Sequence, residues 1–151
     1  MYVPPAFASP GDAASARLID DYGFAVLVAA GADGIPLASH IPILHDAARG
    51  VLVGHLAGPN PQADLLADCA RAGRKVLAVF QGPHGYISPS WYANKHNSVP
   101  TWNYAAVHVY GVPRMIEDAP GLRAIVDTLG KRYERMGWTL DAQDEDYVAR
   151  M

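Results

Sequence analysis

A predicted hairpin in the first third of the chain constrains the fold more than any other feature. Residues 24–30 form an almost continuous apolar run, which is typical of a buried strand. Residues 31–34, centred on an Asp-Gly pair, predict a hairpin turn, and residues 37–44 form the return strand. Pro36 and Pro42 favour an edge or a bulge for that strand, because proline cannot donate a ladder hydrogen bond. A hairpin of this kind implies antiparallel pairing.

Capping signals predict three helices. Asp12 is expected to cap the first and Asp118 the third, while Asn60 with Pro61 begins the second, which ends at Gly73. The inward faces are expected to be Ser15, Leu18, Ile19 and Tyr22, then Leu65, Leu66, Cys69 and Ala70, then Leu122, Ile125, Val126, Leu129 and Tyr133. The segment after residue 135 is only weakly amphipathic.

The remaining segments complete the predicted architecture. Further strands are expected at residues 51–56, 75–81 and 101–115, the last bent at Gly111 and Pro113, while the first nine residues are extended. Residues 82–100 read as one long loop. Five or six strands with few helices predict an α+β fold, in which a small antiparallel β-barrel is flanked by helices. The 151 residues suit a single domain spanning residues 1–151.

Composition disfavours several classes of protein. The formal net charge is -3, and the twelve Lys and Arg are scattered, so the chain offers no basic face for duplex DNA. Cys69 is the only cysteine, which excludes an internal disulfide, and its place on an apolar helix face predicts a buried structural thiol. The N-terminus lacks the pattern of a signal peptide, and no stretch reaches the roughly 20 apolar residues of a membrane span. A cytoplasmic location is therefore expected.

Residues 82–104 are the first candidate site. A loop of this length is usually functional or disordered, and its content of Tyr, Trp, His and Asn argues against disorder. Aromatic faces with interspersed polar groups suit a flat, partly polar ligand. The alternative is that Trp91, Tyr92 and Trp102 only hold the loop against the barrel. The cluster as a whole favours a ligand.

Residues 37–44 together with residues 54–62 are the second candidate. Ser39 shares a strand face with Leu37 and Ile41, whereas His40 faces the other way. The turn into Asn60 would present backbone N–H groups at a helix N-terminus, which attracts anions, although capping alone also explains this residue. The histidines have no metal-ligand spacing, and no nucleophile elbow or phosphate-binding loop occurs, so no metal site is expected and no catalytic residue is identified.

Five motifs occur in order along residues 37–104. They are Leu37-Ala38-Ser39-His40-Ile41-Pro42, Gly54-His55-Leu56-Ala57-x-x-Asn60-Pro61-Gln62, Val79-Phe80-x-Gly82-Pro83, Tyr86-Ile87-Ser88-Pro89-x-Trp91-Tyr92 and Val99-Pro100-Thr101-Trp102-Asn103-Tyr104. Together they resemble the PaiB-type FMN-binding negative transcriptional regulator family, and the opening Met1-Tyr2-x-Pro4-x-x-Phe7 fits it too. The resemblance spans nearly the whole chain.

The resemblance implies a split β-barrel flanked by helices, and a homodimer with FMN between its subunits. By this analogy Ser39, His40, Ile41 and Pro42 line the flavin ring. His55, Leu56, Asn60 and Gln62 lie near the ribityl chain and phosphate. Thr101, Trp102 and Asn103 close over the ring, beside the aromatic Trp91.

Three functions stay open at this stage. The first is a flavin-binding protein with weak flavin-dependent redox activity, so whether it is an enzyme is undecided. The second is a transcriptional regulator that acts without direct duplex contact. The third is a cofactor-free dimeric split barrel that binds a small molecule or a protein, because family members usually continue into a further strand region with a basic motif where this sequence stops at Met151.

Overall fold

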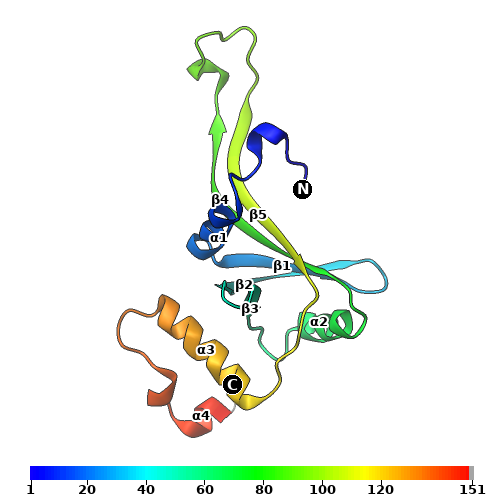
Figure 1. Cartoon of the computed structure of the whole chain (residues 1–151), viewed down its shortest axis with the longest axis vertical. Helices are drawn as coiled ribbons and strands as arrows, with labels where there is room; N and C mark the ends of the chain where they lie inside the picture. The colour runs from blue at the N-terminus through cyan, green and yellow to red at the C-terminus, as the bar shows by residue number, and fades with distance from the viewer. Residues whose placement is uncertain (150–151) are drawn as a thin grey trace.

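The computed structural model describes residues 1–149, and its architecture is α+β (Figure 1). The strands are β1 (Phe24–Ala30), β2 (Pro36–Asp46), β3 (Val51–Gly54), β4 (Val76–Ile87) and β5 (Thr101–Gly111). The α-helices are α1 (Asp12–Asp21), α2 (Pro61–Arg71), α3 (Ala119–Tyr133) and α4 (Glu145–Ala149), and short 3₁₀ turns are η1 (Pro5–Phe7), η2 (Pro89–Trp91) and η3 (Leu140–Ala142). Among residues 1–149 no helix is long and apolar enough to cross a membrane.

The strands form one sheet in the order β3-β2-β1-β4-β5, and every pairing is antiparallel. The predicted hairpin is confirmed, because β1 pairs with β2 from Phe24 opposite Pro42 to Ala30 opposite Pro36. Gly34 closes its turn by donating to the Gly31 carbonyl at 3.2 Å, with a φ of 76° that only glycine adopts freely. Within the described residues the sheet does not close on itself, so β3 and β5 are its edges.

The two prolines of β2 lie where the sequence places them, along an open edge. β3 pairs only with the second half of β2, from Ile43 to Asp46. In the described part of the chain, residues 36–42 therefore pair with β1 alone. Because that side of the strand has no neighbouring strand, the missing N–H groups of Pro36 and Pro42 leave no ladder incomplete there.

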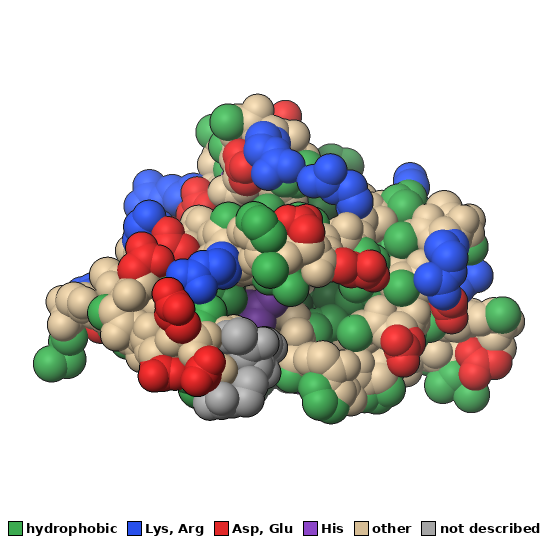
Figure 2. Space-filling model, turned by 90° about the horizontal axis from the view of Figure 1, so that it is seen from below, with side chains coloured by type: hydrophobic (Ala, Val, Ile, Leu, Met, Phe, Trp, Pro, Cys, Tyr) green, Lys and Arg blue, Asp and Glu red, His purple; other side chains and the backbone are tan. Residues whose placement is uncertain are grey.

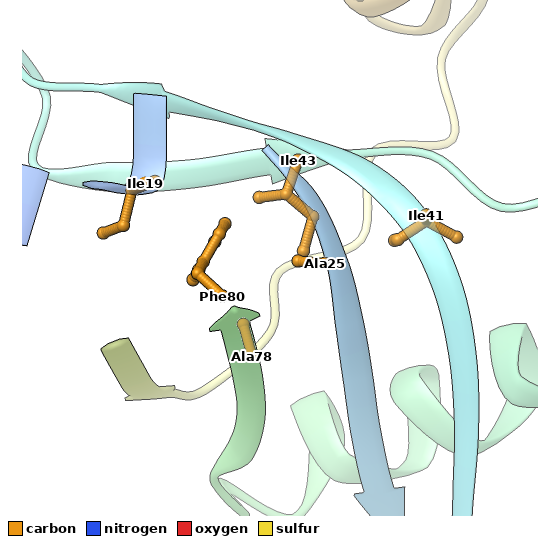
Figure 3. Close-up of a cluster of buried hydrophobic side chains, with 6 residues drawn as sticks. All are labelled: Ile19, Ala25, Ile41, Ile43, Ala78 and Phe80. Atoms are coloured by element: carbon orange, nitrogen blue, oxygen red, sulfur yellow. The ribbon is translucent and has the colours of Figure 1, made fainter. Parts of the chain in front are cut away.

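One face of the sheet carries the core. The main cluster joins α1 to three strands through Ile19, Ala25, Ile41, Ile43, Ala78 and Phe80 (Figure 3). A second cluster of Ala29, Leu66 and Cys69 packs α2 against β1. Cys69 is buried, as predicted, with its Sγ 3.7 Å from the Ala30 carbonyl oxygen. Helix α1 thus packs on the sheet through Leu18 and Ile19, and α2 through Leu65, Leu66 and Cys69. Tyr22, which the predicted inward face of the first helix includes, is 41% exposed instead.

Two of the three predicted helix caps are confirmed. Asn60 Oδ1 accepts from the Gln62 N–H at 2.9 Å, and Asp118 Oδ1 accepts from the Gly121 N–H at 2.8 Å. The prediction for Asp12 is wrong, because the N-cap position is Gly11 and Asp12 is the first helical residue. An acidic residue there still interacts favourably with the helix dipole.

The inward stripe predicted for α3 is only partly correct. Ile125 and Leu129 are buried, and so is Leu140 of η3, but Leu122 and Tyr133 are exposed. The physical reason is that α3 packs against its own return segment at η3 rather than along the sheet. A hydrogen bond and the negative charge of Asp127, 2.6 Å away, raise the pKa of Lys131 near the end of this helix.

The largest error of the sequence prediction concerns residues 82–87. They were expected to belong to a long loop, but β4 continues to Ile87 and pairs with β5. The ladder changes register between Gln81 and His84, so a bulge accommodates Gly82-Pro83, which would otherwise end a strand. The loop proper is residues 88–100. Smaller differences are that β3 and β5 end early, at Gly54 and Gly111, and that Pro5–Phe7 form a turn.

Candidate functional site

A hydrogen-bonded junction connects α2 to the open edge of β2. Asn60 Nδ2 donates to Ser39 Oγ at 3.0 Å. Gln62 Nε2 donates to the carbonyl oxygens of Leu27 at 2.8 Å and Leu37 at 2.9 Å. We call Ser39, Asn60 and Gln62 the β2–α2 junction. Three of the residues assigned to a binding site from the sequence are therefore brought together.

The backbone N–H groups at the N-terminus of α2, which the sequence offers as an anion site, already have hydrogen-bond acceptors at the junction. Asn60 accepts the Gln62 N–H with its side chain and the Ala63 N–H with its carbonyl, and Pro61 has no N–H. Asp64 adds an acidic side chain in the first turn. Because the first donors are already used, the geometry favours the capping alternative for Asn60.

Residues 39–42 alternate between the two faces of β2, as the sequence predicts. Ile41 is buried in the core and Ser39 is half-buried on the same side, whereas His40 is exposed on the outer face. The imidazole ring of His40 lies 6.2 Å from the ring of Phe24. Because the Ile41 side chain is in the core, only its backbone is available to a ligand. Of the pair after β3, His55 is exposed and Leu56 packs against both core clusters.

A cleft of about 510 Å³ opens on the outer face of the sheet beside this segment. Its lining residues, which we call the α1–α3 cleft, are Asp21, Tyr22, Gly23, Phe24, Pro42, Gln81 and Tyr133. Arg132 donates to the Asp20 carbonyl at 2.7 Å and so fixes the end of α3 against the end of α1. Phe24 is 68% exposed, so the cleft wall is apolar and uncovered.

The far halves of β4 and β5 form a two-stranded arm. Residues 84–87 pair with residues 101–104, and together with the connecting loop we call residues 84–104 the β4–β5 arm. Figure 1 shows this arm projecting away from the rest of the molecule. The ring of Trp102 lies 5.7 Å from His84 and 6.2 Å from Tyr86, which gives an aromatic cluster along the ribbon.

The arm aromatics do not hold the loop against the body, which was the alternative reading. Trp91 is 69% exposed, Trp102 57% and Tyr104 63%. Large aromatic rings are seldom exposed together on a protein surface, and exposed apolar patches generally mark binding surfaces. This observation favours the ligand interpretation of the aromatic cluster.

Charge is distributed unevenly along the chain. Residues 69–116, which include all of β4, the arm and β5, contain five Lys and Arg and no Asp or Glu. All fifteen carboxylates lie outside that segment. On the face seen from below, by contrast, both signs are interspersed (Figure 2). The arm is thus suited to an uncharged or anionic partner.

Within one protomer the two groups of predicted site residues remain apart. His40 is opposite Val26, and Val26 is in turn opposite Val79, which pairs with His108 of β5. Trp102 is six residues further along β5, about 20 Å at the rise of a strand. The arm residues Trp91, Thr101, Trp102 and Asn103 therefore do not meet the β2–α2 junction in a single copy.

Three residues of the cleft and the aromatic cluster are not among the site residues that the sequence predicts. Phe24 and Tyr133 line the cleft, and His84 joins the aromatic cluster, although each was assigned only to an element or a loop. The pairing of His84 with Tyr104 could not be foreseen while residues 82–87 were assigned to a loop. Nowhere in residues 1–149 do three His, Cys, Asp or Glu side chains gather as a metal site would require.

Comparison with known families and proteins gives a consistent result. A family model described as "Putative FMN-binding domain" matches residues 1–151. The protease synthase and sporulation protein PAI 2 of Bacillus subtilis is 37% identical over 119 residues, which cover 78% of this chain and 54% of that protein. An uncharacterized protein of Saccharomyces cerevisiae is 45% identical over 87 residues, which cover 54% of this chain and 49% of that protein. The chain thus spans about half the length of the curated relatives it matches.

Proposed function

Since the chain belongs to the FMN-binding domain family, over residues 1–151, we propose that it binds FMN as a PaiB-like flavoprotein. The observation that carries this proposal is the β4–β5 arm, whose exposed Trp102, His84 and Tyr86 form an aromatic surface. Isoalloxazine is a flat ring system with one polar edge, and aromatic faces with neighbouring amides and hydroxyls recognise such a ligand. Thr101 and Asn103 supply those polar groups.

We further propose that the sheet is an open form of a split barrel comprising a single domain. Leu52 of β3 and Val107 and Val109 of β5 pack against the same core cluster, although their strands are the two edges of the sheet. All five strands therefore contribute side chains to one core face. A barrel would enclose this face, with β3 and β5 as the strands between which it is split.

The residues at hand fit the flavin ring better than its phosphate. The open side of β2, at residues 36–42, has no strand partner in the described residues, so its backbone groups are available to the polar edge of the ring. The phosphate carries about two negative charges and normally needs Lys or Arg donors. The N-terminus of α2 offers none, and Lys95 on the arm is the cation that the aromatic cluster brings with it.

The need for both the β2 segment and the arm to contact the ring supports a homodimer with FMN between its subunits. The β2 segment and the arm cannot both contact one ligand within a protomer, whereas a two-fold related copy brings one arm to each β2. In such a site His40 and Pro42 of one copy would orient the ring, and the arm of the other would exclude water from it. When bound, FMN supplies the redox chemistry, and the protein binds and tunes it.

A titration of the purified protein with FMN tests the proposal. We expect saturable binding at micromolar FMN, with quenched flavin fluorescence and a shifted visible spectrum. Riboflavin, which lacks the phosphate, is expected to bind more weakly, and Trp102→Ala is expected to weaken FMN binding. Tyr147→Ala, an exposed aromatic on α4, is the matched control. Spectra that stay those of free FMN at all concentrations would sink the proposal.

Two further roles of the flavin protein are open to direct assay. Weak redox activity predicts that bound FMN is reduced faster than free FMN by a nicotinamide donor under anaerobic conditions. A regulatory role would act through the flavin or a protein partner, since the Lys and Arg residues form no basic block. A gel shift with promoter DNA at low salt would instead reveal direct contact.

The alternative function is a cofactor-free dimeric split barrel that binds a small molecule or a protein partner. The observation that favours it is the saturated N-terminus of α2, where Asn60 satisfies the donors that a phosphate would use. Light scattering together with the FMN titration separates the two functions. A dimer that takes up no flavin supports the alternative, and a dimer that binds one FMN per protomer supports the flavoprotein.

A further inference from the structure

The α1–α3 cleft is a hollow that the proposed flavin site does not use, apart from Pro42 at its border. Its volume of about 510 Å³ is within the range of roughly 300–1,000 Å³ that is usual for small-molecule sites. We propose that this cleft binds a neutral aromatic molecule of about two fused rings that carries one hydrogen-bonding group. The proposal does not depend on FMN.

Three aromatic side chains from two parts of the chain line the cleft. Tyr22 and Phe24 flank the start of β1, and Tyr133 is the last residue of α3. Phe24 is 68% exposed, Tyr133 51% and Tyr22 41%. Aromatic rings pack favourably on other rings in offset or edge-to-face geometry, and in this cleft much of their surface contacts water instead. A flat ring system placed among them would remove that apolar surface from water, which stabilises the complex.

Gln81 gives the cleft one uncharged polar group. Its side chain is exposed, and a primary amide both donates and accepts hydrogen bonds. Gln81 is the last residue of β4 before the register shift that ends at His84. Bulges of this kind are frequent next to functional sites, because they redirect a side chain. A ring compound with a hydroxyl or carbonyl group would bond to Gln81 while its rings contact Phe24.

The charges around the cleft cancel. Asp21 forms an ion pair with Arg17 at 3.5 Å. Arg132 donates to the carbonyl oxygen of Asp20 at 2.7 Å, so a second basic side chain lies at the same rim as a second carboxylate. An ion that entered the cleft would lose hydration and would meet no net opposite charge in return. This balance favours a neutral ligand over an anion or a cation.

One wall of the cleft belongs to a helix that does not pack along the sheet. Helix α3 packs against η3, and the hydrogen bond from Arg132 to Asp20 connects its last turn to α1. A ligand in contact with both Phe24 and Tyr133 would therefore bridge the sheet and α3. Binding should slow the exchange of amide hydrogens in α3, because opening of this wall would first require the ligand to dissociate.

Binding of 2-naphthol in the absence of FMN tests the proposal. This probe is uncharged at neutral pH and has two fused rings with one hydroxyl group. When the protein is titrated into a fixed, low concentration of 2-naphthol, we expect saturable binding with a dissociation constant below about 1 mM, followed by the fluorescence of the probe. The anion 2-naphthoate should bind at least about fivefold more weakly. Absence of saturation, or tighter binding of 2-naphthoate, would overturn the proposal.

Two matched variants locate the bound probe. Phe24→Ala should weaken 2-naphthol binding about tenfold, and its exposed position lets the variant fold. Tyr110→Ala removes an aromatic side chain of β5 that is 57% exposed and lies outside the cleft, so it should leave binding unchanged. Equal effects of the two variants would place the probe elsewhere and so contradict the proposal.

Two further measurements check the polar contact and the movable wall. Gln81→Leu should weaken 2-naphthol about fivefold but change the binding of naphthalene, which lacks the hydroxyl group, by less than about twofold. Hydrogen exchange with bound 2-naphthol should become slower within residues 119–133 and stay the same in the β4–β5 arm. Equal effects of Gln81→Leu on both probes, or unchanged exchange in α3, would overturn the assigned contacts. Because none of these measurements uses FMN, their failure would leave the proposed function standing.

Discussion

Single residues at the β2–α2 junction explain how the start of α2 is held against strands β1 and β2. Gln62 is polar and yet wholly buried, because its amide bridges the carbonyl oxygens of Leu27 and Leu37 on neighbouring strands. The sequence predicts that Asn60 caps α2, since the residue type and Pro61 suffice for that inference. It could not predict the bond from Asn60 to Ser39, because 21 residues separate them and only the fold brings them together.

Replacing Gln62 by Leu should cost about 1–3 kcal/mol of unfolding free energy, since two hydrogen bonds from the buried amide are lost. The measurement is urea denaturation followed by circular dichroism. Gln81→Leu, at an exposed position, is the control and should change stability by less than about 0.5 kcal/mol. Equal stability of Gln62→Leu and the unmodified protein would contradict the structural role.

Asn60→Ala should destabilise the protein by about 1–2 kcal/mol, because it removes both the cap and the bond to Ser39. Asn60→Asp keeps an oxygen for the Gln62 N–H but loses the donor to Ser39, so it should cost less. A double-mutant cycle with Ser39→Ala isolates that bond. A coupling energy of zero in the cycle would mean that the two side chains act independently.

At the scale of elements, the strands near the hairpin could be predicted and the long β4–β5 ribbon could not. Residues 24–30 form a continuous apolar run that is typical of a buried strand. The short turn after them brings the next strand back beside the first, so the antiparallel pairing of β1 and β2 could be predicted. The second half of β4 contains Gly82, Pro83 and Gly85, which locally disfavour a strand. It becomes a strand because β5 pairs with it from Thr101 to Tyr104 across a bulge, and that support is invisible in the local sequence.

The attachment of α3 depends on Gly23. A Cβ at this position would lie 2.6 Å from Tyr133 Oη and 3.0 Å from the Ile43 carbonyl oxygen. Gly23→Ala should therefore destabilise the protein by about 1–3 kcal/mol, measured by thermal or urea unfolding. Adding Tyr133→Ala should recover part of the loss by removing the nearer contact, and a double variant no better than Gly23→Ala would refute this view of the α3 contact.

At the scale of the whole molecule, the family and the α+β class of fold were accessible from the sequence, and the separation of the two groups of predicted site residues within one protomer was not. The motifs around Ser39 and Trp102 identify the FMN-binding family. They do not reveal that Trp102 lies about 20 Å along β5 from the residue that is in register with His40. The sheet order, with β1 and β4 between β2 and β5, separates the two motifs further.

The proposed site, shared between two copies, would link FMN affinity to protein concentration. When the protein is diluted below the dissociation constant of the proposed dimer, the apparent affinity for FMN should fall by about tenfold or more, because free protomers would offer only half of the contacts. Fluorescence titrations at several protein concentrations measure this effect. An affinity that is independent of protein concentration, in a range where sedimentation shows dissociation, would mean that one protomer binds FMN alone.

The placement of the tryptophans has a practical consequence. Of the three in the chain, Trp91 and Trp102 are on the arm and exposed, and Trp138 lies against Gly130 of α3. Intrinsic emission therefore reports chiefly on the surroundings of the arm, where the ring of Trp102 lies 5.7 Å from that of His84. Exchange of Trp138 for Phe would leave a protein whose tryptophan emission originates from the arm alone. The arm thus carries an optical probe at the place where the proposed association and FMN binding would occur.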